Sequence, residues 1–182
     1  TSQNIDARNC SFGGITPAAM TMTQLFALED YIYHTIDNPE IGFVYVKTNN
    51  DYITINSFDD ASGYPDAQIQ RGIDAASNGF TVNVQSGTYA KQIATNRSVF
   101  GVNGPHQFGL FVDKDNLTIR GYDAADAPVT NASAAAVTFT TGATNNFGSS
   151  GIFVQANGVS LEGLKVGNNL NNANVNDNNK TI

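Results

Sequence analysis

Two stretches of this sequence repeat one another at an offset of 42 residues. GLFVDKDNLTIRGYD occupies residues 109 to 123, and GIFVQANGVSLEGLKVG occupies residues 151 to 167. Aligned without a gap, apolar residues meet apolar residues and glycines meet glycines, in the pairs Gly109 and Gly151, Phe111 and Phe153, Val112 and Val154, Leu117 and Val159, Ile119 and Leu161, and Gly121 and Gly163. Alternating apolar residues bounded by glycine are typical of a half-buried strand and its turn.

A third apolar stretch, 137 to 139, lies about midway between Leu117 and Val159. The offset therefore predicts two coils of about 21 residues each, the length of a solenoid repeat. In that arrangement, strands at 117 to 119, 137 to 139 and 159 to 161 pair in parallel, one upon the next. A single coil cannot bury its apolar face alone, so repetition would supply the core.

The sequence before this repeat has a different pattern, and three sections are expected: 1–16, 17–63 and 64–182. The first is a loop or the end of a preceding unit. In the second, a small α+β linker, apolar spacing predicts a helix from about Pro17 to Asp37, and strands at 41–47 and 51–56 flank a loop short enough for a hairpin. The third opens with a short helix capped by Asp66, with Ile69, Ile73 and Ala76 on one face, and begins the stack of strands.

The run AQIQRGIDAASNGFTVNVQSGTY, followed by the two repeated stretches, resembles the opening of a right-handed parallel β-helix of the pectin lyase-like superfamily. That resemblance implies a mainly β solenoid with an N-terminal capping helix. MTQLFALEDYIYHTIDNPEIGFVYVK is similar to linkers between β-helical units of very large bacterial surface proteins, and NIDARNCSFGG resembles the last coil of a preceding unit. Lys180, Thr181 and Ile182 resemble the start of another strand after the Asn-rich loop 168–179, so we expect a segment of a longer polypeptide.

Composition narrows the classes of partner. Nine Lys and Arg against sixteen Asp and Glu give a net charge of −7, which argues against nucleic-acid binding. No apolar run is long enough for a membrane span. Cys10 is the only cysteine, so no disulfide forms within the chain and no cysteine-based zinc site is expected. A secreted or cell-surface bacterial location fits this composition.

The residues that carry catalytic chemistry are few and scattered. His34 and His106 are far apart and match no metal or catalytic motif; His34 is expected as a surface or packing histidine, His106 as a loop residue and Cys10 as an ordinary small residue. Four aspartates could bind Ca²⁺ if a turn gathered them, but turn formation is the favoured interpretation: Asp113, Asp115, Asp123 and Asp126. Four basic residues are candidates for the base of a lyase, and none lies in a lyase motif: Arg97, Lys114, Arg120 and Lys165.

The sequence therefore predicts no catalytic residues and no cofactor, with Ca²⁺ as an open possibility. The leading hypothesis is a structural or adhesive module of a large extracellular β-helical protein, whose partners are neighbouring units of the same polypeptide, other copies of itself, or a carbohydrate or cell-surface ligand. One alternative is the N-terminal part of a polysaccharide lyase or other carbohydrate-active enzyme, which rests on fold analogy alone. A second alternative is the subunit of an extracellular filament.

Overall fold

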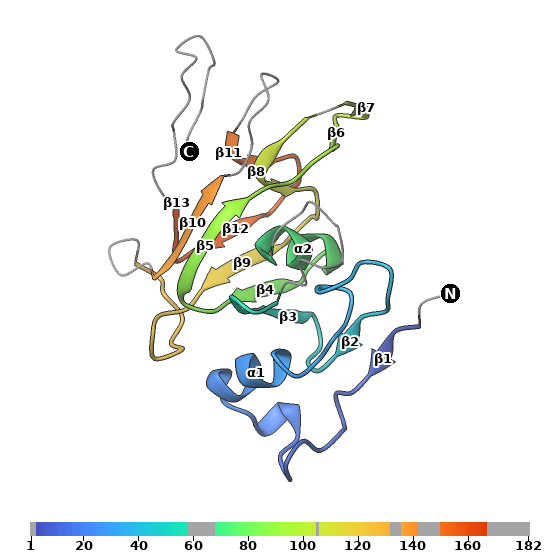
Figure 1. Ribbon diagram of the computed structural model, residues 1–182, viewed down its shortest axis with the longest axis vertical. Coiled ribbons are helices and arrows are strands. Elements are labelled where there is room, and N and C mark those ends of the chain that lie inside the picture. Colours follow the sequence, from blue (N-terminus) through green and yellow to red (C-terminus); the bar gives the residue numbers. More distant parts are fainter. Residues whose placement is uncertain (1–2, 58–67, 105, 132–135, 142–149, 167–182) are drawn as a thin grey trace.

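The computed structural model describes residues 3–57, 68–104, 106–131, 136–141 and 150–166 (Figure 1). The helices are η1 Pro17–Ala19, α1 Met22–Glu29 and α2 Gln68–Ala75. The strands are β1 Ile5–Asp6, β2 Val44–Tyr45, β3 Asn50–Ile53, β4 Thr81–Val84, β5 Gly87–Gln92, β6 Ser98–Val99, β7 Val102–Asn103, β8 Phe108–Val112, β9 Thr118–Gly121, β10 Val137–Thr141, β11 Ser150–Val154, β12 Ser160–Glu162 and β13 Leu164–Val166. In Figure 1 the N-terminal section lies at one end of the molecule and β11 toward the other.

Three parallel sheets hold the main core. Their strand orders are β12-β9-β4-β3, β13-β10-β5 and β11-β8. The chain visits the three sheets in turn, so we call β4, β5 and β8 the first layer, β9, β10 and β11 the second layer, and β12 with β13 the third layer. Residues from all three sheets, such as Val82, Phe139 and Leu110, meet in one buried apolar cluster.

The expected fold class, a mainly β right-handed parallel β-helix, is wrong. The described residues form separate sheets of two to four short strands beside two α-helices, which is a mixed fold with no solenoid of 21-residue coils. Paired strands are not separated by a constant number of residues along the chain. Val137 pairs with Leu164 on one side and with the much more distant Gly87 on the other. The predicted pairing of 137–139 with both 117–119 and 159–161 is also wrong, because β10 lies in another sheet, and β9 pairs directly with β12 and with β4.

The gapless alignment at an offset of 42 residues is confirmed by the strand register. Phe153 lies opposite Phe111 in the pair β11–β8, and Leu161 lies opposite Ile119 in the pair β12–β9. Residues 42 positions apart are thus neighbours in successive layers, and the midpoint stretch 137 to 139 belongs to a different sheet. Alternation showed which side chains face the core but could not show which sheet a strand joins.

The turns before β4, β9 and β12 are also aligned from layer to layer. Their residues with positive φ are Gly79 (79°), Asn116 (56°) and Gly158 (68°). The Asn78 side chain accepts a hydrogen bond from the Asp115 N–H at 3.1 Å, and the Asp115 carboxylate accepts one from the Asn157 N–H at 2.8 Å. Glycine and asparagine are the residues that tolerate this backbone conformation best, so turn chemistry and register agree.

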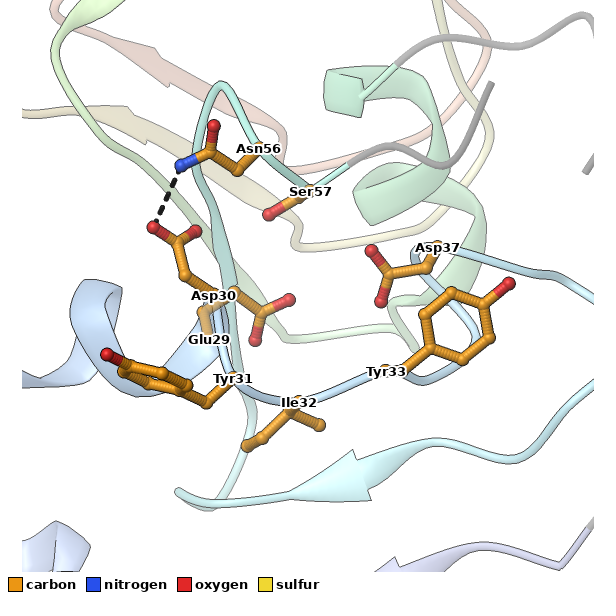
Figure 2. A pocket seen from close by; sticks show the side chains of 8 residues that line it. All are labelled: Glu29, Asp30, Tyr31, Ile32, Tyr33, Asp37, Asn56 and Ser57. Carbon is orange, nitrogen blue, oxygen red and sulfur yellow. Dashed lines mark hydrogen bonds between the residues drawn. The ribbon is translucent and has the colours of Figure 1, made fainter. Parts of the chain in front are cut away.

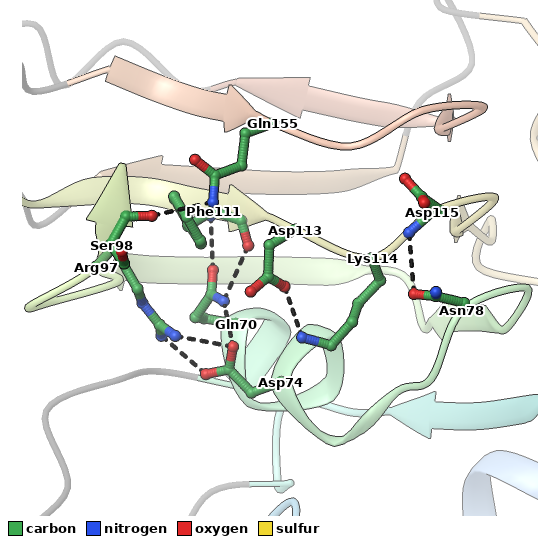
Figure 3. A network of polar contacts seen from close by, with 10 residues as sticks. All are labelled: Gln70, Asp74, Asn78, Arg97, Ser98, Phe111, Asp113, Lys114, Asp115 and Gln155. Carbon is green, nitrogen blue, oxygen red and sulfur yellow. Dashed lines mark hydrogen bonds and ion pairs between the residues drawn. The ribbon is translucent and has the colours of Figure 1, made fainter. Parts of the chain in front are cut away.

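Helix α2 covers the open side of the first layer, where it contacts β3, β5 and β8. The predicted inward face is confirmed for Ile69 and Ile73, both fully buried; the predicted cap Asp66 lies outside the described residues. Gln70 also forms hydrogen bonds with the backbone of β8. Its side-chain oxygen accepts a hydrogen bond from the Phe111 N–H at 2.7 Å, and its Nε2 donates to the Phe111 carbonyl at 3.1 Å (Figure 3). One side-chain amide thereby replaces a missing strand beside β8.

The N-terminal section differs from the sequence prediction. Helix α1 is shorter than the stretch 17 to 37: Thr21 and Gln24 form its capping box, and it ends at Glu29, after which the chain folds back. The predicted hairpin of 41–47 with 51–56 does not form, because β2 pairs in parallel with β1 and β3 pairs in parallel with β4. Only an isolated antiparallel bridge, Lys47 with Asn50, joins the two strands across their loop. Strand β3 is thereby the edge of the four-stranded sheet, whereas β1 and β2 form a two-stranded sheet of their own.

Candidate functional site

A pocket of about 270 Å³ lies where α1 ends and the chain folds back (Figure 2). Its walls come from the end of α1, from the segment 31 to 37, and from the loop after β3. They consist of three carboxylates, two tyrosines and three smaller groups: Glu29, Asp30, Asp37, Tyr31, Tyr33, Ile32, Asn56 and Ser57. It has more titratable side chains than the pocket that Arg8 and Lys47 line.

His34 contacts two of the acidic residues that line the pocket, Glu29 and Asp37. Its Nε2 lies 2.9 Å from Glu29 Oε1, and its Nδ1 accepts a hydrogen bond from the Val44 N–H at 3.3 Å. A ring nitrogen that accepts carries no proton, so the proton lies on Nε2, and Glu29 is bound by a neutral imidazole. The ring also packs on Phe43, with 5.1 Å between ring centroids. Of the two expectations for His34, a surface or a packing histidine, the structure shows the second, since the side chain is buried.

The other two carboxylates of the pocket accept hydrogen bonds from neutral groups, and Asp37 also interacts with the charged Arg71 guanidinium. Asp30 accepts hydrogen bonds from the Thr54 hydroxyl and from Asn56 Nδ2, the latter at 3.0 Å. Asp37 accepts one from the His34 backbone N–H at 3.0 Å. Burial raises the pKa of Glu29 and of Asp37, in both cases as the largest cause and against the hydrogen bond from His34. Burial therefore disfavours the charged forms of Glu29 and Asp37, although three acidic side chains line the pocket.

Asp51 is a further buried acid close to this group. Its side chain points into the protein from β3 with 2 % exposure, and neither carboxylate oxygen has a hydrogen-bond partner among the described residues. Burial raises the pKa of Asp51 well above its usual range, and the charge of Glu29 raises that pKa further. An uncompensated buried carboxylate binds a proton rather than remain charged.

We expect the protein to be more stable at mildly acidic than at alkaline pH. A carboxyl whose pKa is raised on folding contributes stability below its unfolded value of 3.8, and that stability is lost as pH rises toward the folded value. Asp51→Asn should reduce the loss between about pH 5 and about pH 8 and should stabilise the protein at the higher pH. Urea denaturation at both values measures it.

The surface substitution Asp113→Asn is the control and should leave the pH dependence unchanged. Asp6 does not interfere in this range, because the Arg8 guanidinium lowers the pKa of Asp6 to about 2, and its contribution is lost only when the solution becomes more acidic than the range tested. An Asp51→Asn variant that kept the full pH dependence would contradict the prediction.

Of the four aspartates considered as possible calcium ligands, Asp113, Asp115 and Asp123 make turn hydrogen bonds or ion pairs. Asp113 pairs with Lys114 at 2.6 Å, Asp115 binds the Asn157 N–H, and one Asp123 oxygen accepts from the N–H groups of Ala125 and Ala127. The favoured interpretation as turn residues is confirmed for Asp115 and Asp123. Within the part of the chain that the structure describes, no three His, Cys, Asp or Glu side chains are placed to hold a metal ion.

The basic residues weighed for a lyase are spread over the molecule. Arg97 forms two hydrogen bonds with Asp74 of α2, at 3.0 and 2.8 Å, and lies over the Phe111 ring (Figure 3). Arg120 pairs with Glu162 at 2.7 Å. Arg120 and Glu162 occupy equivalent repeat positions with opposite charge, a pattern that predicts an exposed strand position where either charge is tolerated. The strand register shows that the two residues are cross-strand neighbours. Cys10 is exposed, and His106 lies in a loop.

Glu29, Asp30, Asp37 and Asp51 were not anticipated as a group. The available signal was the density of acids around the single histidine in LEDYIYHTIDNPE. The apolar spacing of this stretch predicts one long helix, on which these side chains would point in several directions. The fold-back after Glu29 is what brings them together.

The comparisons with known proteins give no match, so the interpretation of this site rests on its geometry. No family model matches the chain, and neither the curated proteins nor the solved structures include a significant match. The resemblance to the pectin lyase-like superfamily is therefore still a prediction about relationship, while the fold class that it implied is corrected above. Neither of the described α-helices is long and apolar enough to cross a membrane.

Proposed function

We propose that this chain is a structural and adhesive module of an extracellular bacterial protein, which joins a further β layer through its third layer. The observation that carries this proposal is a difference in burial between equivalent positions. Ile119 of the second layer is fully buried, whereas Leu161, its partner in the third layer, is 38 % exposed. Val137 is fully buried, whereas its partner Leu164 is only partly so.

The backbone supports the same proposal. In the described sheets, β9 and β10 have a strand on each side, but β11, β12 and β13 have one on a single side. An edge strand presents N–H and C=O groups that can pair with another strand, and strand addition is a common way to bind an extended segment. A module whose apolar pattern continues to its edge is suited to stacking with neighbouring units or with a second copy.

Substituting Leu161 should test the proposal. We expect the full chain to self-associate at high concentration and Leu161→Lys to abolish that association, because a charge at the apolar edge opposes strand addition. The unfolding temperature should change little, since the residue is already exposed. Light scattering over a concentration series is the measurement.

Ile55→Lys is the matched control, because Ile55 is also exposed, at 54 %, but lies outside the third layer. It should leave association intact. A wild-type chain that stays monomeric throughout the series, or equal effects of the two substitutions, would contradict the proposal.

A further inference from the structure

The turns before β4, β9 and β12 are joined by a pair of hydrogen bonds that recurs from layer to layer. Between the first two layers, the Asp115 N–H donates to the Asn78 side chain at 3.1 Å (Figure 3), and the Gly79 N–H donates to the Asp115 carbonyl at 2.9 Å. Between the second and third layers, the Asn157 N–H donates to the Asp115 carboxylate at 2.8 Å, and the Asn116 N–H donates to the Asn157 carbonyl at 2.7 Å. Each layer thus offers a side-chain oxygen and a backbone N–H, and one residue of the next layer binds both.

A third hydrogen bond follows this pair where the strands begin. The Thr118 N–H donates to the Phe80 carbonyl and the Ser160 N–H donates to the Leu117 carbonyl, both at 2.9 Å. In both layers this donor lies three positions after the residue that binds the preceding turn, 118 after 115 and 160 after 157. Together the three hydrogen bonds determine which residues of adjacent strands lie opposite one another, and a slip by one residue would turn the apolar side chains away from the core.

The third layer presents the same three groups at its open side: Asn157 Oδ1, the Gly158 N–H and the Val159 carbonyl. Within the described part of the chain, none of the three takes part in a hydrogen bond. The Asn157 Nδ2 donates to the Asp115 carboxylate at 3.4 Å, which leaves Oδ1 as the acceptor for a further partner. Asn157 and Gly158 are exposed, and Gly158 has the positive φ, 68°, of the preceding turns.

We infer that these three groups bind the turn and strand of one further β layer, carried by another β unit, and set its register. The inference rests on the proposed function and adds the chemistry of the partner. The reason for this occupant is continuity, because the same contact already joins the first layer to the second and the second to the third. In all three turns the residue that carries the side-chain oxygen is Asn or Asp, and the next residue is Gly or Asn.

The strand that follows the turn should match the side chains of β12. Leu161 is 38 % exposed, so an apolar side chain is expected over it. Glu162 is the next residue, and its partner in β9 is the basic Arg120. A basic or neutral side chain is therefore expected on its open side as well, because like charges directly opposite one another destabilise a sheet. The incoming strand would extend the sheet by strand addition.

A synthetic copy of the second layer is the probe for this site. The capped peptide has the sequence of residues 113 to 123, DKDNLTIRGYD, which in the inferred register places its isoleucine over Leu161 and its arginine over Glu162. It is titrated into the full chain at a concentration at which light scattering shows monomers. We expect the NMR amide signals of residues 157 to 162 to shift, and the signals of β3, the other edge of the same sheet, to remain unchanged.

Two matched substitutions isolate the contact of Asn157. Asn157→Ala removes the acceptor and should weaken peptide binding about twofold to tenfold, the effect of one net hydrogen bond. Asn157→Asp keeps an acceptor, as Asp115 does in the second layer, and should restore most of that affinity. An ester in place of the peptide amide at position 115 removes the donor. The ester should weaken binding to the wild type by a similar factor and have no further effect on Asn157→Ala, because both changes remove the same hydrogen bond.

The outcomes separate this inference from the proposed function. Absence of shifts at residues 157 to 162, shifts confined to β3, or equal affinities of the amide and ester peptides would overturn the inference. The proposed function requires instead that Leu161→Lys abolish self-association, which the comparison of the two peptides does not test. Loss of self-association in Leu161→Lys, together with unchanged peptide affinity in Asn157→Ala, would refute the role of the turn and leave the proposed function in place.

Discussion

Gln70→Leu should be among the most destabilising single substitutions in this protein. Gln70 is fully buried, and its amide satisfies both backbone groups of Phe111 at the edge of β8. Leucine keeps the volume and the helix propensity but leaves a buried N–H and a buried C=O without partners. Each orphaned group costs about 1–3 kcal/mol, so the loss should be one of several kcal/mol in the free energy of unfolding.

Two measurements distinguish this mechanism from a general packing defect. Urea denaturation should show the loss in Gln70→Leu but not in Gln3→Leu, the same substitution at an exposed position. Hydrogen exchange should also show that the Phe111 amide, well protected in the wild type, exchanges faster than its neighbours in β8 after the substitution. If Phe111 kept its protection relative to those neighbours, the strand-replacing role of Gln70 would be refuted.

The correspondence between the layers was predictable because it rests on local rules. Phe111 and Phe153 share a register since both belong to strands bounded by equivalent turns, and the turn residues at 79, 116 and 158 are glycine or asparagine. Helix α2 was predictable for a similar reason: Ile69 and Ile73 lie four residues apart on one face. Such signals are contained within a few residues of sequence.

The partner of each strand was not predictable in the same way. The stretch 51 to 56 is as compatible with a hairpin as with a parallel sheet, and the outcome depends on β4, which lies some thirty positions further along the chain. Sequence alternation states which side chains point inward but leaves the neighbour open. The 21-residue coil was wrong for this reason, since Phe139 has the right apolar character but faces the core from another sheet.

The acidic pocket depends on long-range contacts throughout. Glu29 approaches His34 only because the chain reverses after α1, and that reversal is held by the Val44 N–H bond to His34 and by the contacts of Arg71 with the carbonyl oxygens of Ile36 and Asp37. An amphipathic spacing that continues past Glu29 indicates a longer helix if such contacts are unknown. Acids and a histidine crowded into one short segment are therefore a better warning of a polar site than periodicity alone.

Phe26→Ala should show that α1 is held to the sheets by aromatic packing. The Phe26 ring is fully buried and meets two others edge to face: Tyr52 of β3 at 6.0 Å and Tyr122, just after β9, at 5.4 Å. These rings lie on the outer side of the sheet, in an apolar cluster separate from the main core. Truncating a buried phenylalanine costs about 3–5 kcal/mol, and the edge-to-face pairs are lost with it.

Phe100→Ala is the matched control for this prediction, because Phe100 is 80 % exposed and its removal should change stability by less than about 0.5 kcal/mol. Urea denaturation gives both values. The position of Phe26 makes a second, sharper test possible: α1 ends at Glu29, so loosening the helix should also displace the pocket, and the amide signals of residues 29 to 37 should move even where the protein remains folded. A Phe26→Ala variant with wild-type stability and unchanged signals in that segment would show that the pocket is supported by the fold-back alone and that α1 contributes nothing to it.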